Sequence, residues 1–205
     1  MEKGLANLEK HVRNIKVVYG LPVTVAINRF PSDTGKELDL VFDKCRQLGV
    51  PAAVSEVFAK GGEGGLNLAQ NVLKCIEQDE SRFNYVYPLE MSIKDKISEI
   101  AAKIYGAEGV VYTKDAGNQI ANIESLGYQN LPVCMAKTQY SLSDDPMLLG
   151  RPEGFKITVR QVRLSAGAGF VVAILGEIMT LPGLPKIPSA EKIDVDANGR
   201  VSGLF

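Results

Sequence analysis

Residues 21–28 read Leu-Pro-Val-Thr-Val-Ala-Ile-Asn, a nearly continuous apolar run that begins after Gly20 and ends at Arg29-Phe30-Pro31. A short run of this kind between turn-forming residues is typical of a strand buried on both faces of a parallel sheet. A second apolar run covers residues 50–58. The segment between the two runs repeats apolar residues every three or four positions, which indicates a helix. This order predicts two parallel strands joined by a crossover helix.

Further helices are predicted around this unit. Residues 7–18 have helical spacing of their apolar side chains. Thr34 and Glu37 have the spacing of a capping box, which starts a helix, and Gly49 is placed to end it. The run Gly-Gly-Glu-Gly-Gly at residues 61–65 leads into another helix. The predicted buried face of that helix consists of Leu66, Ala69, Val72, Leu73 and Ile76.

The second half of the chain has a different texture. A strand is predicted over residues 83–89, followed by a helix from Ser92 to Gly106. Beyond it, one helix at 115–126 and strands at 109–112, 131–136, 156–164 and 169–175 are predicted. The expected fold class is α/β: a Rossmann-like parallel sheet with crossover helices, followed by a smaller α+β domain. We place the boundary near Gly106, so that the domains cover residues 1–106 and 107–205.

The charge balance narrows the class of partner. The chain has 23 basic and 24 acidic residues and a formal net charge of −1. Without a basic excess, neither nucleic acid nor an anionic membrane is expected as its main partner. The longest apolar run, residues 167–175, is far shorter than the about 20 residues of a membrane-spanning helix. The charged N-terminal segment does not read as a secretory signal, so we expect a cytoplasmic protein.

Cysteine and histidine are too few for several kinds of site. The three cysteines lie far apart without a Cys-x-x-Cys pair, which argues against a disulfide framework. His11 is the single histidine and cannot assemble a zinc site or a Ser-His-Asp triad. Residues 194–199 begin like a calcium loop, but Phe205 stands where a glutamate is required, so an Asn-Gly hairpin is predicted instead. No metal site is predicted.

Two loops are the leading candidates for a ligand site. Ligands of parallel sheets bind at the carboxyl ends of the strands, and residues 28–34 and 58–65 follow the two predicted strands. A glycine-rich run before a helix offers backbone N–H groups and the helix dipole to an anion. The run matches neither the phosphate loop Gly-x-x-x-x-Gly-Lys-Ser/Thr nor the dinucleotide motif Gly-x-Gly-x-x-Gly, so a structural turn is an equal alternative. Its glycines are Gly61, Gly62, Gly64 and Gly65.

Two aromatic residues support the prediction of a ligand site at these two loops. Phe30 and Phe58 follow successive strands, and two rings at such adjacent strand ends can flank a planar heterocycle. A weaker candidate is the polar loop after residue 136. A capped turn explains residues 143–146 of that loop, but the residues Lys137, Thr138 and Gln139 need another explanation.

Several of these motifs, taken in order, resemble formate–tetrahydrofolate ligase, also called 10-formyltetrahydrofolate synthetase. The matching segments are Gly4-Leu5, Asn7 to His11, Pro22 to Thr34, Gly61 to Gly65, Leu131 to Ser141 and Arg163 to Phe170. The resemblance covers the C-terminal part of the family, whose members are well over twice as long. It implies that the N-terminal portion, with the phosphate loop and the formyl phosphate site, is not in this chain. Members of the family form tetramers, so a homo-oligomer is one partner to consider.

The resemblance also implies a reaction and a set of site residues. ATP, with Mg²⁺, activates formate to formyl phosphate, and N10 of tetrahydrofolate attacks it to give 10-formyltetrahydrofolate. No covalently bound cofactor and no catalytic residue of this chain are implied. Phe30 and Phe58 correspond to the pair of rings that stack on the pterin, although tryptophan is usual at the second position. Pro31, Val54 and the glycine run correspond to the lining of the folate and nucleotide cleft.

Three functions therefore stay open. The chain has no phosphate-loop lysine, so we expect it to be catalytically incomplete alone and to need a phosphate-loop portion, in cis or as a separate chain. A stand-alone module that binds folate or nucleotide is an alternative. The third is a structural subunit of a split enzyme.

Overall fold

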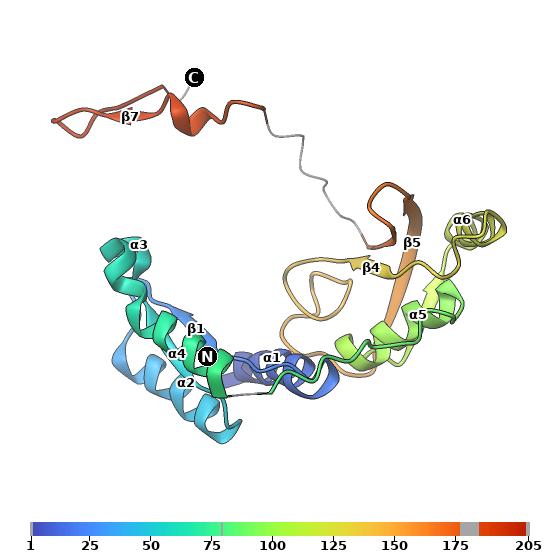
Figure 1. Cartoon of the computed structure of the whole chain (residues 1–205), viewed down its shortest axis with the longest axis horizontal. Coiled ribbons are helices and arrows are strands. Elements are labelled where there is room, and N and C mark those ends of the chain that lie inside the picture. The colour runs from blue at the N-terminus through green and yellow to red at the C-terminus, as the bar shows by residue number, and fades with distance from the viewer. Residues whose placement is uncertain (1, 79, 177–184, 204–205) are drawn as a thin grey trace.

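The structure is a computed structural model of the 205-residue chain, and it describes residues 2–78, 80–176 and 185–203. Figure 1 shows two lobes, with the N-terminal helix α1 (Glu2–Arg13) between them. Asn14 Nδ2, just after this helix, donates to the carbonyl oxygen of Ile104 at 2.8 Å. Lys10 Nζ donates to the carbonyl oxygen of Lys103 at 2.7 Å. The N-terminal segment is thereby fastened to the second lobe.

The first lobe contains the predicted strand, helix and strand. Strands β1 (Val25–Asn28) and β2 (Ala52–Ser55) pair in parallel, with Val25 opposite Ala52 and Asn28 opposite Ser55. Helix α2 (Gly35–Gln47) joins them. The capping box is confirmed, because the Thr34 side chain accepts from the Glu37 N–H while the Glu37 carboxylate accepts from the Thr34 N–H. After β2 follow α3 (Val57–Lys60), a 3₁₀ turn η2 (Gly61–Gly65) and α4 (Leu66–Gln78).

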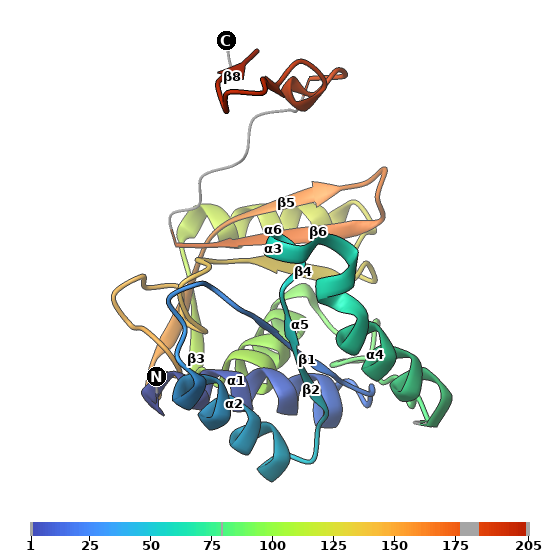
Figure 2. The ribbon, with the colours of Figure 1, turned by 90° about the vertical axis from the view of Figure 1, so that its left-hand side faces the viewer.

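The second lobe consists of α5 (Ile93–Ile100), the π-helical turn η3 (Ala101–Tyr105), β3 (Gly109–Tyr112), α6 (Lys114–Ser125), β4 (Val133–Ala136), β5 (Lys156–Ser165) and β6 (Phe170–Leu175). Its strands form a four-stranded mixed sheet in the order β3-β5-β6-β4. The outer pairs β3–β5 and β4–β6 are parallel, and the central pair β5–β6 is antiparallel. Helices α5 and α6 contact the sheet (Figure 2), and buried isoleucines such as Ile97, Ile120 and Ile157 form its core. The expected α/β class with a smaller α+β part is confirmed.

The C-terminal segment lies away from both lobes in the two views (Figures 1 and 2). It contains the short turn η4 (Ser189–Glu191) and a hairpin of β7 (Asp194–Val195) and β8 (Val201–Ser202), as the Asn-Gly signal predicted. Gly199 has a φ of 78°, which glycine adopts without strain. Residues 177–184 and 204–205 of the predicted second domain, with Phe205, lie outside the described residues.

The strand predicted over residues 83–89 is wrong, because this segment is a loop. Its apolar residues serve packing instead: Val86 and Tyr87 are buried in the core of the second lobe. The Tyr87 hydroxyl accepts from the Val133 N–H at 2.8 Å, and so ties the loop to β4. An apolar pattern shows that side chains are buried. A loop that packs against a sheet can have the same pattern as a strand.

Two predictions of burial in the first lobe are also wrong. β1 is not buried on both faces, since its residues alternate between half-buried and exposed. The apolar face of α4 is exposed, with Leu73 at 57% and Ile76 at 70% of full exposure. The reason is that α4 packs on β2 with another face: Leu68, Asn71 and Cys75 are half-buried, and Asn71 Nδ2 donates to the carbonyl oxygen of Ala52 at 3.3 Å. Helical periodicity shows which face of a helix is apolar but not which element covers it.

Each lobe has its own cluster of buried apolar residues. A small cluster contains Val12, Cys45 and Val50, and a large one extends from Val86 to Leu175. The segment from Val86 to Tyr105 therefore packs with the second lobe. The division into domains 1–106 and 107–205 stays a prediction, because packing does not show which part folds alone.

Candidate functional site

The two aromatic residues singled out in the sequence lie at the same edge of the β1–β2 sheet. The two parallel strands end side by side, at Asn28 and Ser55. Phe30 lies two residues after β1, and Phe58 lies in α3, three residues after β2. Phe30 is 65% exposed and Phe58 is 99% exposed. Among the described residues, the rings in contact are those of Tyr19, Phe83 and Tyr85, so neither Phe30 nor Phe58 has an aromatic partner.

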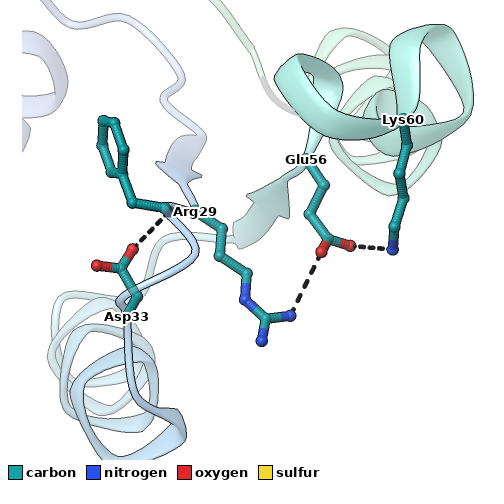
Figure 3. A network of polar contacts seen from close by, with 5 residues as sticks. Arg29, Asp33, Glu56 and Lys60 are labelled. Carbon is teal, nitrogen blue, oxygen red and sulfur yellow. Dashed lines mark hydrogen bonds and ion pairs between the residues drawn. The ribbon is translucent and has the colours of Figure 1, made fainter.

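The loop that carries Phe30 is fixed by its own backbone. The Arg29 N–H continues the ladder to the Ser55 carbonyl oxygen at 3.1 Å. The Phe30 N–H then donates to Asp33 Oδ2 at 2.8 Å (Figure 3), and the Asp33 N–H returns to the Phe30 carbonyl oxygen at 3.0 Å. This Asp side chain closes the turn. Pro31, in the middle of that turn, is exposed.

A charged network that the sequence analysis did not identify lies between the ends of the two strands (Figure 3). Glu56 Oε1 lies 3.3 Å from Arg29 Nη1, and Glu56 Oε2 lies 2.6 Å from Lys60 Nζ. The hydrogen bond from Lys60 and the charges of both cations hold the pKa of the Glu56 carboxyl below its usual range, against a smaller effect of desolvation. The i,i+4 spacing of Glu56 and Lys60 was a readable signal, whereas the Arg29 contact depends on strand pairing.

The glycine run is explained in part by packing. Gly61 has a φ of 58°, and a Cβ on Gly64 would lie 2.5 Å from the carbonyl carbon and oxygen of Glu56. A side chain is therefore excluded by contact at Gly64, and it would strain the backbone at Gly61. A Cβ on Gly62 meets nothing within 4 Å, and Gly61 and Gly62 are exposed. The Leu66 N–H at the start of α4 is bonded to the Glu63 carbonyl oxygen. An anion-binding role of Gly61, Gly62, Gly64 and Gly65 stays a prediction.

The fourth predicted lining residue, Val54, is half-buried in β2. Its neighbours in that strand, Ala53 and Ser55, are buried, in keeping with the alternation of side chains between the two faces of a sheet. Val54 pairs with Ile27 of β1 in the register of the two strands. It therefore lies one residue before the end of the sheet, close to the loops of Phe30 and Phe58.

In the polar loop after β4, the side chains of Lys137 and Thr138 form hydrogen bonds within the loop. Lys137 Nζ donates to the carbonyl oxygens of Thr138 and Ser141 and lies 5.5 Å from the centre of the Tyr105 ring. Burial lowers the pKa of Lys137 and raises the pKa of Tyr105 to about 12. Thr138 Oγ1 accepts from the Tyr140 N–H, and Gln139 is exposed. Within the described residues, no hydrogen bond or ion pair joins these three candidates to the first lobe's loops.

Neither a membrane-spanning helix nor a metal-binding cluster of side chains occurs among the described residues. No helix in them combines the length and apolar character needed to cross a membrane. No group of three or more histidine, cysteine, aspartate or glutamate side chains in them is placed to hold a metal ion. Cys45 is a buried thiol and Cys134 an exposed one, and neither forms a disulfide.

Fold and candidate site define an α/β protein whose parallel strands end in exposed, glycine-rich and aromatic loops. A model of the formate–tetrahydrofolate ligase family matches this chain over residues 1–205. Because the match extends over the chain from end to end, the chain belongs to the formate–tetrahydrofolate ligase family. Ligases of this family use ATP and tetrahydrofolate as substrates.

Proposed function

We propose that this chain is the folate-side portion of a formate–tetrahydrofolate ligase, in which the rings of Phe30 and Phe58 stack on the pterin of tetrahydrofolate. The observation that carries the proposal is the exposure of both rings at one edge of the sheet, without aromatic partners. Burying a phenylalanine side chain is worth about 1.5–3 kcal/mol. A planar heterocycle between the rings would recover that free energy and add favourable stacking geometry.

The rest of the cleft would be lined by Pro31, Val54 and the glycine run. Pro31 is exposed next to Phe30, and Gly61 and Gly62 present open backbone after Phe58. This backbone suits close approach of a folate or of the nucleotide. A magnesium ion would arrive with ATP and be held by its phosphates, since no cluster of carboxylates in the described residues fits one.

The implied reaction is the formation of 10-formyltetrahydrofolate from formate, ATP and tetrahydrofolate through formyl phosphate. The chain would contribute positioning of the folate amine, and phosphoryl transfer depends on groups that hold the phosphates. This sequence has no phosphate-loop motif, so we infer that it does not complete the reaction alone. No residue of the chain is proposed as a catalytic group.

The partner we propose is a phosphate-loop portion, in cis or as a separate chain. The exposed apolar residues of α4 support an interface, because contiguous apolar patches on a protein surface commonly mark interaction sites. Those with the largest side chains are Leu66, Val72, Leu73 and Ile76. A homo-oligomer is a second partner that the same face would allow.

The stacking proposal is tested by titration of tetrahydrofolate against the chain and its Phe30→Ala variant. Loss of one ring should weaken binding about tenfold, which corresponds to about 1.4 kcal/mol. Phe83→Ala is the matched control, because Phe83 is also an exposed ring of the chain but stacks on Tyr19. Unchanged affinity of Phe30→Ala, or an equal loss in both variants, would contradict the proposal.

A turnover assay with ATP, formate and tetrahydrofolate separates this function from its alternatives. Activity of the chain alone would contradict catalytic incompleteness. Binding of tetrahydrofolate without activity, even with a phosphate-loop chain added, would indicate a stand-alone binding module. Activity that appears only in the mixture, without measurable binding by this chain alone, would indicate a structural subunit of a split enzyme.

A further inference from the structure

We infer that Glu56 is a positioning residue that clamps the loop carrying Phe30 to the segment carrying Phe58. In this way it sets the separation of the two rings. The functional consequence rests on the proposed stacking of the pterin between these rings. The clamp itself concerns only contacts within the chain, so it is tested with and without a ligand.

The backbone of Glu56 organises the segment that carries Phe58. The Glu56 carbonyl oxygen accepts from the Ala59 N–H at 3.0 Å and from the Lys60 N–H at 2.9 Å, which forms the short helix α3. The Glu56 N–H donates to the Gly64 carbonyl oxygen at 3.0 Å. Gly64 packs so closely on Glu56 that a Cβ there would lie 2.5 Å from its carbonyl oxygen. Phe58 therefore lies in a loop that starts at Glu56 and returns to it through Gly64, with its ring exposed.

The side chain of Glu56 extends this organisation to the other strand (Figure 3). Its carboxylate contacts Lys60 of its own segment at 2.6 Å and Arg29 of the β1 loop at 3.3 Å. Arg29 immediately precedes Phe30, and its backbone is fixed to β2 through Ser55. The hydrogen bond from Lys60 lowers the pKa of the Glu56 carboxyl further from neutrality, and the group is ionised at neutral pH. The Arg29–Glu56 pair is thus a side-chain contact that joins the two strand exits.

The expected consequence of this clamp is local. Arg29, Glu56 and Lys60 are partly exposed, and ion pairs in such positions contribute little to global stability. Loss of the pair should instead let the Phe30 loop and the Phe58 segment open independently of the core. Two rings that must flank one ligand depend on a fixed separation, so binding should weaken even though the fold persists.

The first test is amide hydrogen exchange in Glu56→Gln and in its matched control Glu63→Gln. Both substitutions remove one negative charge from the segment of residues 56–65, which carries Phe58. Glu63 is exposed, and no hydrogen bond or ion pair of its side chain is present among the described residues. We expect exchange in residues 29–34 and 57–65 to accelerate about threefold or more in Glu56→Gln and to stay unchanged in Glu63→Gln. Equal exchange in the two variants would overturn the clamp.

The second test measures binding in a Phe58→Trp background. The chain contains no tryptophan, so the introduced indole is its single tryptophan fluorophore. Adding Glu56→Gln should weaken tetrahydrofolate binding about fivefold, and Arg29→Gln should then add little, because contacting groups are non-additive. Full additivity of Glu56→Gln and Arg29→Gln would overturn the role of their pair.

The two tests keep this inference separate from the proposed function. If the wild-type chain and the Phe58→Trp variant bind no tetrahydrofolate, the stacking proposal fails, and hydrogen exchange still decides whether Glu56 clamps the loops. If Phe30→Ala weakens binding about tenfold while Glu56→Gln changes neither exchange nor affinity, the stacking proposal holds and the clamp is wrong.

Discussion

Helices α4 and α5 carry similarly regular apolar faces and differ in what covers them. Ile93 and Ile97 of α5 are fully buried against the four-stranded sheet. Leu73 and Ile76 of α4 are mostly exposed beside a sheet of two strands. An amphipathic pattern therefore has two physical outcomes: a core where a sheet packs on the apolar face of the helix, and a surface for association where the sheet packs on another face.

The largest expected difference between the two helices is the cost of truncation. Ile97→Ala should lower the free energy of unfolding by about 2–5 kcal/mol, because it removes fully buried methyl groups and leaves a cavity. Leu73→Ala should change it by no more than about 0.5 kcal/mol. Urea unfolding of both variants measures the difference. A large cost at Leu73 would mean that the α4 face is covered in solution, and its dependence on protein concentration would reveal a second copy.

A buried lysine of α5 gives the next largest effect. Lys96 is fully buried, and its Nζ donates to the carbonyl oxygens of Gln129 at 2.6 Å and Leu131 at 3.0 Å. Lys96→Met leaves both acceptors without this partner and should cost about 1–3 kcal/mol at neutral pH. Thermal or urea unfolding at pH 7 measures this cost. A neutral effect would mean that water replaces the ammonium group in the variant.

The stability difference between wild type and Lys96→Met should depend on pH, with a defined sign. Burial lowers the pKa of Lys96 from 10.5, against smaller opposing effects of Glu90 and Glu124. The unfolded chain therefore binds more protons between the folded pKa and 10.5, and stability attributable to this group rises with pH across that window. Wild type should gain stability relative to Lys96→Met as the pH approaches 10.5. A difference that is flat with pH would contradict the lowered pKa.

Each lobe contains a helix with the same kind of N-cap, so the cost of losing a cap can be compared between the lobes. Thr34 caps α2 in the first lobe and Ser92 caps α5 in the second, each accepting from a backbone N–H three residues on. Replacement of either residue by alanine should cost about 1 kcal/mol. Because the first lobe has the smaller core, Thr34→Ala should also raise hydrogen exchange mainly within α2. A global rise in exchange would show that the two lobes unfold together.

The smallest effect on the chain itself is expected for Ile76→Asp. Ile76 is 70% exposed, so the substitution should change stability by no more than about 0.5 kcal/mol. It should nevertheless abolish association of α4 with a phosphate-loop chain, because a desolvated charge at an apolar interface is costly. Size-exclusion chromatography of the mixture measures this. Undiminished association would place the interface elsewhere.

Much of the fold was predictable because it depends on local signals. The apolar runs locate β1 and β2, the Thr34–Glu37 spacing starts α2, and Asn198-Gly199 forms the hairpin turn. The candidate site was predictable only in its aromatic and glycine parts, which follow the ends of the runs. The contact of Arg29 with Glu56 was not, since these residues are 27 positions apart and meet only through the register of two strands.

Local periodicity and turn chemistry are properties of a few neighbouring residues, so the amino-acid sequence alone sufficed to place most helices and strands and to locate Phe30 and Phe58 after two of them. Burial depends on what lies across space. Only the tertiary structure decided that residues 83–89 anchor as a loop, that the apolar face of α4 stays exposed, and that Glu56 lies between Arg29 and Lys60. Each depends on how the strands pair and on which face of a segment packs against them, which no short stretch of sequence encodes.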